Sequence, residues 1–345
     1  MIRVLMAEDS RTVRSLITQI LESDPEIRVV GTASDGAEAV EMAERLRPDL
    51  ITMDIHMPVM DGFEATRQIM ARAPAPIIII SSMARSEDVQ LSLRATQLGA
   101  VMVLPTPVGP GSPDFARQSA ELVSMARAMS GVKVVRRWDR SPAAPEPQRV
   151  AARASSSPVQ LVAIAASTGG PAALQQILAA LPAAFPAPVL VVQHIARGFT
   201  APLVEWLGST CPPRVRLAID GERPVPGTVY LAPDDAHLTL APGGAISLSS
   251  SPPIGGFRPS GSALFESVGR MCGTTAAAVI LTGMGDDGVS GLRTAHARGV
   301  RVIAQDEASS IVHGMPREAV RAGVADEVLP LTEIAARLMA LAGMP

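Results

Sequence analysis

Residues 50–62 are Leu-Ile-Thr-Met-Asp-Ile-His-Met-Pro-Val-Met-Asp-Gly, a short apolar run that ends at Asp54 and is followed by turn residues. Such a run predicts a buried strand, and the same alternation of an apolar run with an amphipathic stretch fills residues 1–125. Five β–α units of this length predict a parallel, doubly wound α/β sheet. The expected strands are Ile2–Ala7, Arg28–Thr32, Leu50–Met53, Ile77–Ser81 and Val101–Leu104, and the expected helices are Thr12–Glu22, Gly36–Leu46, Asp61–Arg72, Glu87–Leu98 and Asp114–Met129.

Three carboxylates come directly after strands of this sheet. Glu8 and Asp9 follow the first strand, and Asp54 follows the third. Because neighbouring strand ends open on one crevice, we expect these side chains to converge. They would repel one another without a cation between them, and carboxylate oxygens suit Mg²⁺. A carboxylate beside such a cation can attack a phosphate donor and form an aspartyl-phosphate, to which Ser81 could donate a hydrogen bond. The alternative is that these acidic residues only cap the helices that follow.

Together with Met53–Gly62 and Ser81-Ser82, these carboxylates resemble the receiver domain of response regulators. The resemblance covers residues 1–125 and implies a flavodoxin-like fold with a five-stranded parallel sheet. It also implies that Asp54 is phosphorylated and that a histidine kinase is the phosphodonor. The Mg²⁺ ligands that it implies are Asp9, Asp54 and the backbone carbonyl of His56, with Glu8 assisting.

The chain departs from the receiver pattern at Thr106, because the pattern expects lysine before Pro107. In receivers the ammonium group of that lysine is expected to pair with the phosphoryl oxygens. A threonine hydroxyl can donate one neutral hydrogen bond but supplies no charge. We therefore expect Asp54 to be phosphorylated but its phosphorylation to be coupled more weakly to the rest of the protein. Arg85 is the nearest residue that could supply the missing charge instead.

The alternation stops between Gly131 and Pro158, a stretch rich in proline, serine and arginine without apolar periodicity. These features predict a solvated interdomain linker over residues 126–156, whose basic residues could instead bind an acidic partner. A second α/β alternation predicts a doubly wound domain with a mostly parallel sheet in residues 157–345. The expected strands are Leu161–Ala165, Val189–Gln193, Thr228–Ala232, Ala277–Thr282 and Val300–Ala304, and the expected helices are Ala172–Leu181, Gly261–Gly269, Gly288–Arg298, Arg317–Ala322 and Leu331–Ala342.

Ser167 stands between a predicted strand and a predicted helix, within the segment Ala165–Pro171. A serine on such a turn is exposed, and nearby backbone N–H groups can bind an oxyanion. The nucleophile motif G-x-S-x-G is only partly matched, because Ala165 occupies the position of its first glycine. From this segment alone, the loop could equally bind a phosphate group or cap the helix.

A serine nucleophile needs a base and an acid that orients the base. The chain has five histidines, and His194 is the best candidate because it ends the strand predicted beside that of Ser167. A purely structural role for this histidine is the alternative. The segment Thr282–Gly288 also follows a strand and offers Asp286 and Asp287 as the acid. The order Ser…His…Asp differs from the order found in α/β-hydrolases.

Eight segments of this half look like the chemotaxis protein-glutamate methylesterase (CheB) family. By that resemblance Ser167 is the nucleophile, His194 the base and Asp287 the orienting acid, because Asp286 falls where the family usually has asparagine. The segments are Ala166–Pro171, Gln193-His194, Gly198–Thr200, Tyr230–Pro233, Arg258–Ser260, Leu281–Gly288, and Ala304–Ser309 with Gly314–Ala319.

The resemblance also implies that the backbone N–H of Met284 binds the oxyanion and that Thr168 lines the site. The chain departs from the family pattern at two positions. Ala165 replaces a glycine, and Ser262 replaces the aspartate common after Arg-Pro-Ser. We expect neither residue to touch the triad, although Ser262 could alter contacts with the substrate.

The function implied is that of an esterase controlled by phosphorylation. It would hydrolyse glutamyl γ-methyl esters on chemotaxis receptors, release methanol, and deamidate receptor glutamines as a second activity, without a cofactor in the esterase half. The unphosphorylated receiver would cover the catalytic face. Two alternatives remain, namely a receiver fused to a non-catalytic binding module and a serine hydrolase for small diffusible esters.

The composition of the chain limits the classes of protein it can belong to. Its 345 residues suggest two or three domains, and 47% hydrophobic residues suffice for packed cores and argue against wholesale disorder. The 30 basic and 33 acidic residues give a net charge of −3, which disfavours nucleic-acid binding. No segment resembles a signal peptide or approaches the roughly 20 apolar residues of a membrane-spanning helix. Only two cysteines are present, so we expect a cytoplasmic protein that is not inserted in a membrane.

Overall fold

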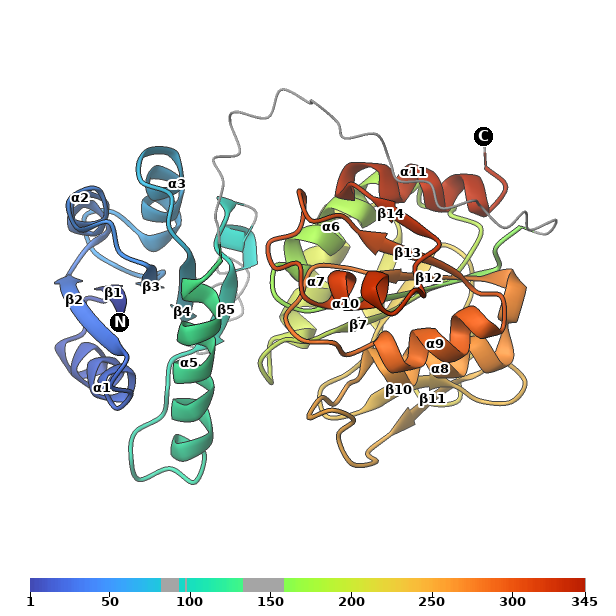
Figure 1. Cartoon of the computed structure of the whole chain (residues 1–345), viewed down its shortest axis with the longest axis horizontal. Helices are drawn as coiled ribbons and strands as arrows, with labels where there is room; N and C mark the ends of the chain where they lie inside the picture. The colour runs from blue at the N-terminus through green and yellow to red at the C-terminus, as the bar shows by residue number, and fades with distance from the viewer. Residues whose placement is uncertain (82–92, 97, 133–157, 345) are drawn as a thin grey trace. The chain divides into compact units, whose positions relative to one another are not determined.

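The computed structural model describes residues 1–81, 93–96, 98–132 and 158–344. They form two compact units, one N-terminal and one C-terminal (Figure 1). Of the predicted helix Glu87–Leu98, residues 93–96 and 98 are described, and they are helical. Ser82, Arg85 and most of the predicted linker lie outside the described residues, while the last helix of the N-terminal unit continues to Ser130.

The N-terminal unit is built on a parallel sheet in the order β2-β1-β3-β4-β5, which confirms the predicted flavodoxin-like fold. Its strands are largely buried, and the side chains of Ser10, Asp35 and Asp61 cap the helices α1, α2 and α3 by accepting hydrogen bonds from backbone N–H groups of the first turn. The elements are β1 (Ile2–Ala7), α1 (Arg11–Glu22), β2 (Ile27–Ala33), α2 (Gly36–Leu46), β3 (Leu50–Asp54), α3 (Gly62–Arg72), β4 (Ile77–Ser81), β5 (Met102–Pro105) and α5 (Phe115–Ser130).

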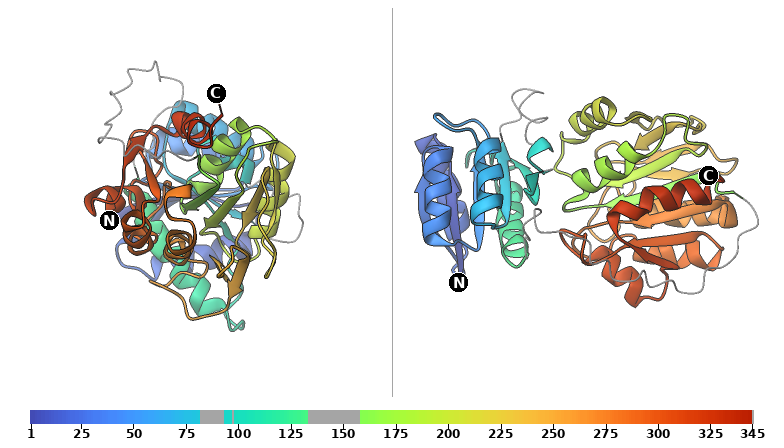
Figure 2. Two further views of the ribbon diagram at one scale, coloured as in Figure 1. Left: turned by 90° about the vertical axis from the view of Figure 1, so that its right-hand side faces the viewer. Right: turned by 90° about the horizontal axis from the view of Figure 1, so that it is seen from above.

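The C-terminal unit contains a seven-stranded sheet in the order β14-β13-β12-β6-β7-β9-β8, and its neighbouring strands pair in parallel, as predicted. The helices α6, α7 and α11 pack together, as do α8, α9 and α10, and the sheet lies between the two groups (Figures 1 and 2). The strands are β6 (Leu161–Ala166), β7 (Val189–Gln193), β8 (Arg214–Leu217), β9 (Thr228–Leu231), β12 (Ala276–Ile280), β13 (Arg301–Gln305) and β14 (Glu327–Leu329), and the helices are α6 (Gly170–Ala180), α7 (Thr200–Thr210), α8 (Gly261–Met271), α9 (Val289–Ala297), α10 (Met315–Arg321) and α11 (Leu331–Leu341).

Several elements of this unit were not predicted. The helix α7 contains Pro202 and Gly208, which weaken a helical pattern, and β8 and β14 are four and three residues long. A two-stranded antiparallel hairpin also stands apart from the main sheet, formed by β10 (His237–Leu240) and β11 (Ile246–Ser249). Such short strands carry too few residues for a reliable periodic pattern.

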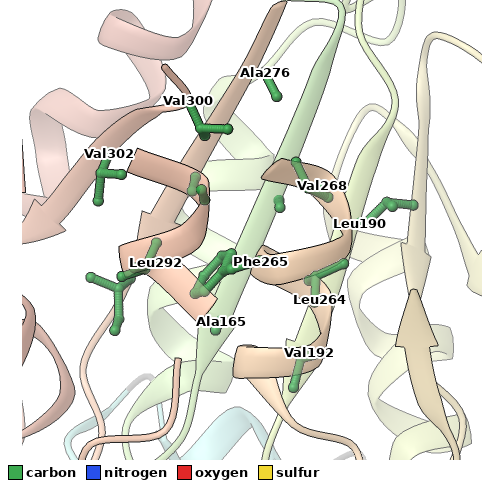
Figure 3. Close-up of a cluster of buried hydrophobic side chains, with 14 of the residues drawn as sticks. Ala165, Leu190, Val192, Leu264, Phe265, Val268, Ala276, Leu292, Val300 and Val302 are labelled. Carbon is green, nitrogen blue, oxygen red and sulfur yellow. The ribbon is translucent and has the colours of Figure 1, made fainter. Parts of the chain in front are cut away.

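The buried core under α8 fixes the position of this helix relative to β6 and β12. Leu264 and Phe265 of α8 pack with Ala165 of β6 and with Leu292 of α9 (Figure 3). The two helices approach closely at Gly291, where a Cβ atom would overlap the carbonyl oxygen of Ser262. The first turn of α8 is therefore held next to the loop between β12 and α9, and this arrangement builds the site described next.

The chain order creates a switch point at β6. From β6 the sheet continues to β7 on one side and to β12 on the other. Loops at the carboxyl ends of these strands therefore diverge and leave room for a ligand, as is general in open α/β sheets. Among the described residues, no helix is long and apolar enough to cross a membrane.

Candidate active site and phosphorylation site

The three residues of the predicted triad follow three adjacent strands. Ser167 comes directly after β6, His194 directly after β7, and Asp287 lies in the loop after β12. Backbone hydrogen bonds extend beyond the strands into these loops. The N–H of Ser167 donates to the carbonyl of Thr282 at 3.0 Å, and the N–H of His194 donates to the carbonyl of Ala166 at 2.9 Å. The sheet itself thus fixes the backbones of Ser167 and His194.

The carboxylate of Asp287 is buried and lies 2.9 Å from Nε2 of His194. It also accepts hydrogen bonds from the Ser260 hydroxyl at 2.7 Å and from the backbone N–H groups of Gly261 and Ser262 at 2.6 and 3.2 Å. Burial alone raises the pKa of this carboxyl, but the hydrogen bonds from His194, Ser260 and Gly261 outweigh burial and lower the pKa to about 2. Asp287 is therefore ionised at neutral pH. Its neighbour Asp286 is exposed.

The imidazole of His194 is bound to Asp287 through Nε2, so Nδ1 is the nitrogen left to accept a proton. Nδ1 is buried and has no hydrogen-bond partner among the described residues. One face of the ring is covered by Phe257, whose ring centroid lies 4.2 Å away with only 9° between the planes. Sequence reasoning gave no indication of Phe257, because its contact with His194 joins two distant loops.

The turn that carries Ser167 offers free donors for an oxyanion. Among the described residues, the N–H groups of Thr168, Gly169 and Met284 have no hydrogen-bond acceptor, whereas the N–H of Ser167 is used by Thr282. A Cβ atom on Gly283 would come within 2.6 Å of Cβ of Ser167, so the backbone at Gly283, the residue before Met284, lies against Ser167. The predicted roles of Met284 and Thr168 are compatible with this geometry.

Two residues of the site were placed wrongly or missed. We expected Ser262 not to touch the triad, and this expectation was wrong, because its N–H donates to Asp287 while its hydroxyl accepts a hydrogen bond from the N–H of Gly288 at 2.8 Å. Gln193 was missed as a site residue. Its buried amide donates to the carbonyl oxygens of both Ser167 and His194, at 2.8 and 2.7 Å. The available signals were its position at the end of β7, beside the predicted base, and its place in the family-like segment Gln193-His194.

The N-terminal unit brings together the three predicted carboxylates. Oxygen atoms of Glu8, Asp9 and Asp54 all lie within 4.8 Å of one another. Burial, followed by repulsion from Asp54, raises the pKa of Glu8 to about 7. Burial also raises the pKa of Asp54 to about 6, although backbone N–H groups of Ile55 and His56 oppose this effect. The helix cap next to them is Ser10, so the alternative that these carboxylates are only helix caps loses its support.

The donor set of this acidic cluster fits a magnesium ion. Mg²⁺ prefers hard oxygen ligands that carry uncompensated negative charge. The charge of the ion would favour the ionised form of Glu8 and Asp54, whose pKa values are raised. Ser81 is buried at the end of β4, where its carbonyl accepts a hydrogen bond from the N–H of Thr106 at 3.0 Å. Thr106 therefore follows β5 at the same edge of the sheet.

Comparison with known proteins identifies the families that the two halves resemble. The model of the CheB methylesterase family matches residues 162–338, and that of the response regulator receiver domain matches residues 4–112. A "protein-glutamate methylesterase/protein-glutamine glutaminase 4" of Myxococcus xanthus is 52% identical over 339 residues, covering 98% of this chain and 96% of that protein. A "protein-glutamate methylesterase/protein-glutamine glutaminase 3" of Anaeromyxobacter dehalogenans is 52% identical over 344 residues, covering 98% of both chains.

A solved structure extends this agreement to three dimensions. The CheB methylesterase catalytic domain of Thermotoga maritima is 41% identical and superposes with a TM-score of 0.52, covering 53% of this chain and 98% of that one. The matches confirm the predicted α/β fold, the order of receiver and esterase halves, and the predicted activity class of a protein-glutamate methylesterase/protein-glutamine glutaminase. Because both halves match and the relatives are similar along nearly the full length, the chain belongs to the CheB methylesterase family.

Proposed function

We propose that Ser167, His194 and Asp287 are the catalytic triad of this methylesterase and that phosphorylation of Asp54 controls it. The observation that carries the proposal is the 2.9 Å contact between Nε2 of His194 and Asp287, at the strand ends that also hold Ser167. The substrates are glutamyl γ-methyl esters of chemotaxis receptors, and receptor glutamines are a second substrate. The names of the curated relatives support both activities.

The chemistry follows from the protonation state of the triad. Ionised Asp287 accepts the Nε2–H of His194, which leaves the lone pair on Nδ1. Ser167 Oγ attacks the ester carbonyl carbon while its proton passes to Nδ1. The tetrahedral intermediate then collapses, the bond to the methoxy oxygen breaks, and the proton on Nδ1 moves to that oxygen to release methanol. Water, deprotonated by His194, next attacks the acyl-enzyme and restores the glutamate carboxylate and Ser167.

Backbone donors would stabilise the charge that develops in this reaction. The free N–H groups of Thr168, Gly169 and Met284 surround the turn of Ser167 and could bind the oxyanion. In the glutaminase reaction the same steps apply, with ammonia as the leaving group. No cofactor is required, because every proton transfer runs through His194.

The receiver would act through its acidic cluster. Asp9, Asp54 and the backbone carbonyl of His56, with Glu8 assisting, would hold Mg²⁺, which supplies positive charge beside the phosphoryl group. A histidine kinase would be the phosphodonor, Asp54 would accept the phosphoryl group, and Ser81 would donate a hydrogen bond to it. In the unphosphorylated state the receiver would block access to the esterase, and phosphorylation would relieve the block. The protein would work in the cytoplasm.

Two other functions remain to be separated from this one. A non-catalytic binding module has no need for a buried acid–imidazole pair beside backbone N–H groups that lack acceptors among the described residues, so the geometry disfavours it. A hydrolase for small diffusible esters would use the same triad, and only its substrate would differ.

The test measures methanol release from methylated receptor membranes and cleavage of a small methyl ester by the same purified protein. Release from the receptor, abolished by Ser167→Ala in a folded protein, is the expected result. Near-normal release by Ser167→Ala would contradict the triad. Rapid cleavage of the small ester with the receptor left methylated would favour the small-ester hydrolase.

A further inference from the structure

The loop between β11 and α8, residues 250–260, contacts both the base and the acid of the proposed triad. Phe257 stacks on the imidazole of His194, and Ser260 donates its hydroxyl hydrogen to Asp287. Neither contact has a part in the proton transfers proposed above. Because one loop supplies both, its conformation sets the position of two catalytic groups at once.

The hydrogen bond from Nε2 to Asp287 does not by itself prevent the imidazole from rotating out of its plane. A single bond fixes one corner of the ring, and Nδ1 has no partner among the described residues that would fix the opposite side. The flat contact with Phe257, at 4.2 Å and 9°, restricts rotation of the ring out of its plane. Offset or parallel stacking of this kind is favourable and directional, unlike contact with an aliphatic side chain.

The loop that carries Phe257 is fixed by its own hydrogen bonds. Ile254 and Phe257 exchange two backbone hydrogen bonds of 3.0 Å across Gly255-Gly256, whose positive φ angles of 59° and 89° suit a tight hairpin turn. Arg258 donates to the carbonyl oxygens of Ser250 and Ser251, at 3.0 and 3.3 Å. The tip of the loop therefore has a defined shape although Ile254 is exposed.

His237 joins the two ends of the same segment. This histidine of β10 is buried, and its Nδ1 accepts a hydrogen bond from the N–H of Ser260 at 3.2 Å. Since Nδ1 is the acceptor, Nε2 carries the proton and donates to the carbonyl of Pro252, also at 3.2 Å. One side chain thus connects residue 252 to residue 260 and keeps Phe257 facing His194.

We propose that Phe257 is a positioning residue for the esterase reaction. Its ring holds the imidazole of His194 in the plane that directs Nδ1 to the nucleophile, and His237 maintains the loop that presents it. This role rests on the proposed function of His194 as the base. It predicts that a flat aromatic side chain is needed at residue 257 for turnover but not for binding of the receptor.

Three substitutions at residue 257 and one control at residue 254, all in the full-length protein, test the proposal. Phe257→Leu and Phe257→Met keep an apolar side chain but lose the flat face, so kcat should fall about ten-fold with KM nearly unchanged. Phe257→Tyr keeps the face and should restore kcat to within about two-fold of wild type. Ile254→Ala changes the same turn without touching His194, and its kcat should equal that of wild type.

A second measurement separates positioning from receptor binding. A small organophosphonate that phosphonylates an activated serine reports on the Ser167–His194 pair without the receptor. Phe257→Leu and Phe257→Met should slow this labelling by the same factor as kcat. Equal labelling rates for wild type and both variants, or a change in KM alone, would overturn the positioning role.

The same reagent tests the triad independently. Labelling of wild type that is lost in Ser167→Ala supports the proposed nucleophile whatever Phe257 does. Unchanged labelling in the Phe257 variants would then refute only the role of Phe257. Labelling that persists in Ser167→Ala would refute the triad, and the positioning proposal with it.

Discussion

At the scale of single residues, the proposed esterase site contains one carboxyl, that of Asp287, whose pKa is low although the group is buried. Asp287 has four hydrogen-bond donors around it, one of which is His194 and three of which come from residues 260–262. The first turn of a helix is a favourable place for an anion, because its N–H groups lack partners within the helix. The acid is thus stabilised as the anion that a protonated imidazole requires.

Replacing this acid should therefore remove most of the activity. Asp287→Asn should reduce kcat by about 10³–10⁴-fold, the loss expected when the orienting acid of a triad becomes an amide. The matched control is Asp286→Asn, which changes an exposed neighbour and should leave kcat unchanged. Methanol release by both variants, with thermal melting to show that each is folded, checks the assignment. A larger loss in Asp286→Asn than in Asp287→Asn would reverse it.

In the receiver site the carboxyl pKa values are raised, whereas the pKa of Asp287 is lowered. The pKa values of Glu8 and Asp54 are raised from 4.5 and 3.8 to about 7 and about 6, mainly by burial. The folded state therefore binds these protons more tightly than the unfolded state. Its stability decreases as the pH rises from about 4 to 7 without a cation.

Magnesium should reverse this loss of stability. We expect Mg²⁺ to raise the melting temperature of the receiver transition more at pH 8 than at pH 5, because both carboxyls are ionised at the higher pH. Without Mg²⁺ at pH 8, Asp54→Asn should be more stable than wild type, since one repelling charge is gone. Calorimetry at the two pH values measures both effects. An equal Mg²⁺ effect at both pH values would contradict the raised pKa values.

Thr106 should limit how strongly phosphorylation activates the protein. A hydrogen bond to a charged group contributes about 1–2 kcal/mol more than a neutral one, which corresponds to a roughly five- to thirty-fold weaker shift of a two-state equilibrium. Thr106→Lys should therefore increase the ratio of activities with and without phosphodonor. The activity of the isolated esterase half serves as the reference. An unchanged ratio in a variant that is still phosphorylated would show that another group supplies the charge.

At the scale of helices and strands, the sequence predicts the elements with a clear pattern and misses those without one. The five strands of the receiver and the central strands β6, β7 and β12 are apolar runs next to turn residues, and they carry Asp54, Ser167 and His194. These site residues are predictable because strand ends converge. Gln193 and Ser260 lie in segments that resemble the family, but their contacts with Ser167 and Asp287 join distant segments. The contact of Phe257 with His194 does so too, and no local pattern encodes such contacts.

The packing of α8 against α9 gives a test at this scale. A Cβ atom on Gly291 would overlap the carbonyl oxygen of Ser262, next to the N–H group that binds Asp287. Gly291→Ala should destabilise the protein by about 1–3 kcal/mol and lower kcat as well, because the first turn of α8 must move.

The matched control for this packing is another glycine within a helix. The nearest atom to a Cβ on Gly208 of α7 would lie at 3.9 Å, so alanine fits there without overlap. Gly208→Ala should leave kcat unchanged and stabilise the helix by up to about 1 kcal/mol. Denaturant unfolding of both variants gives the free energies. Similar values for the two substitutions would contradict the close approach of α8 and α9.

At the scale of the whole molecule, the chain combines a receiver domain with a methylesterase domain. Each unit has its own sheet and its own core, and the related catalytic domain from Thermotoga maritima corresponds to the second unit alone. Control of one unit by the other requires that phosphorylation stabilise the open state relative to the blocked state. Residues 157–345 alone should therefore release methanol faster than the unphosphorylated full-length protein.

The central claim is that phosphorylation of Asp54 controls hydrolysis by Ser167. It is tested most directly by the initial rate of methanol release from methylated receptor membranes, measured for the full-length protein with Mg²⁺, before and after addition of a phosphodonor. The rate should rise on addition for wild type, stay at its low basal value for Asp54→Asn, and be absent in both conditions for Ser167→Ala. A rise of the same size in Asp54→Asn, or methanol release by Ser167→Ala, would contradict the claim.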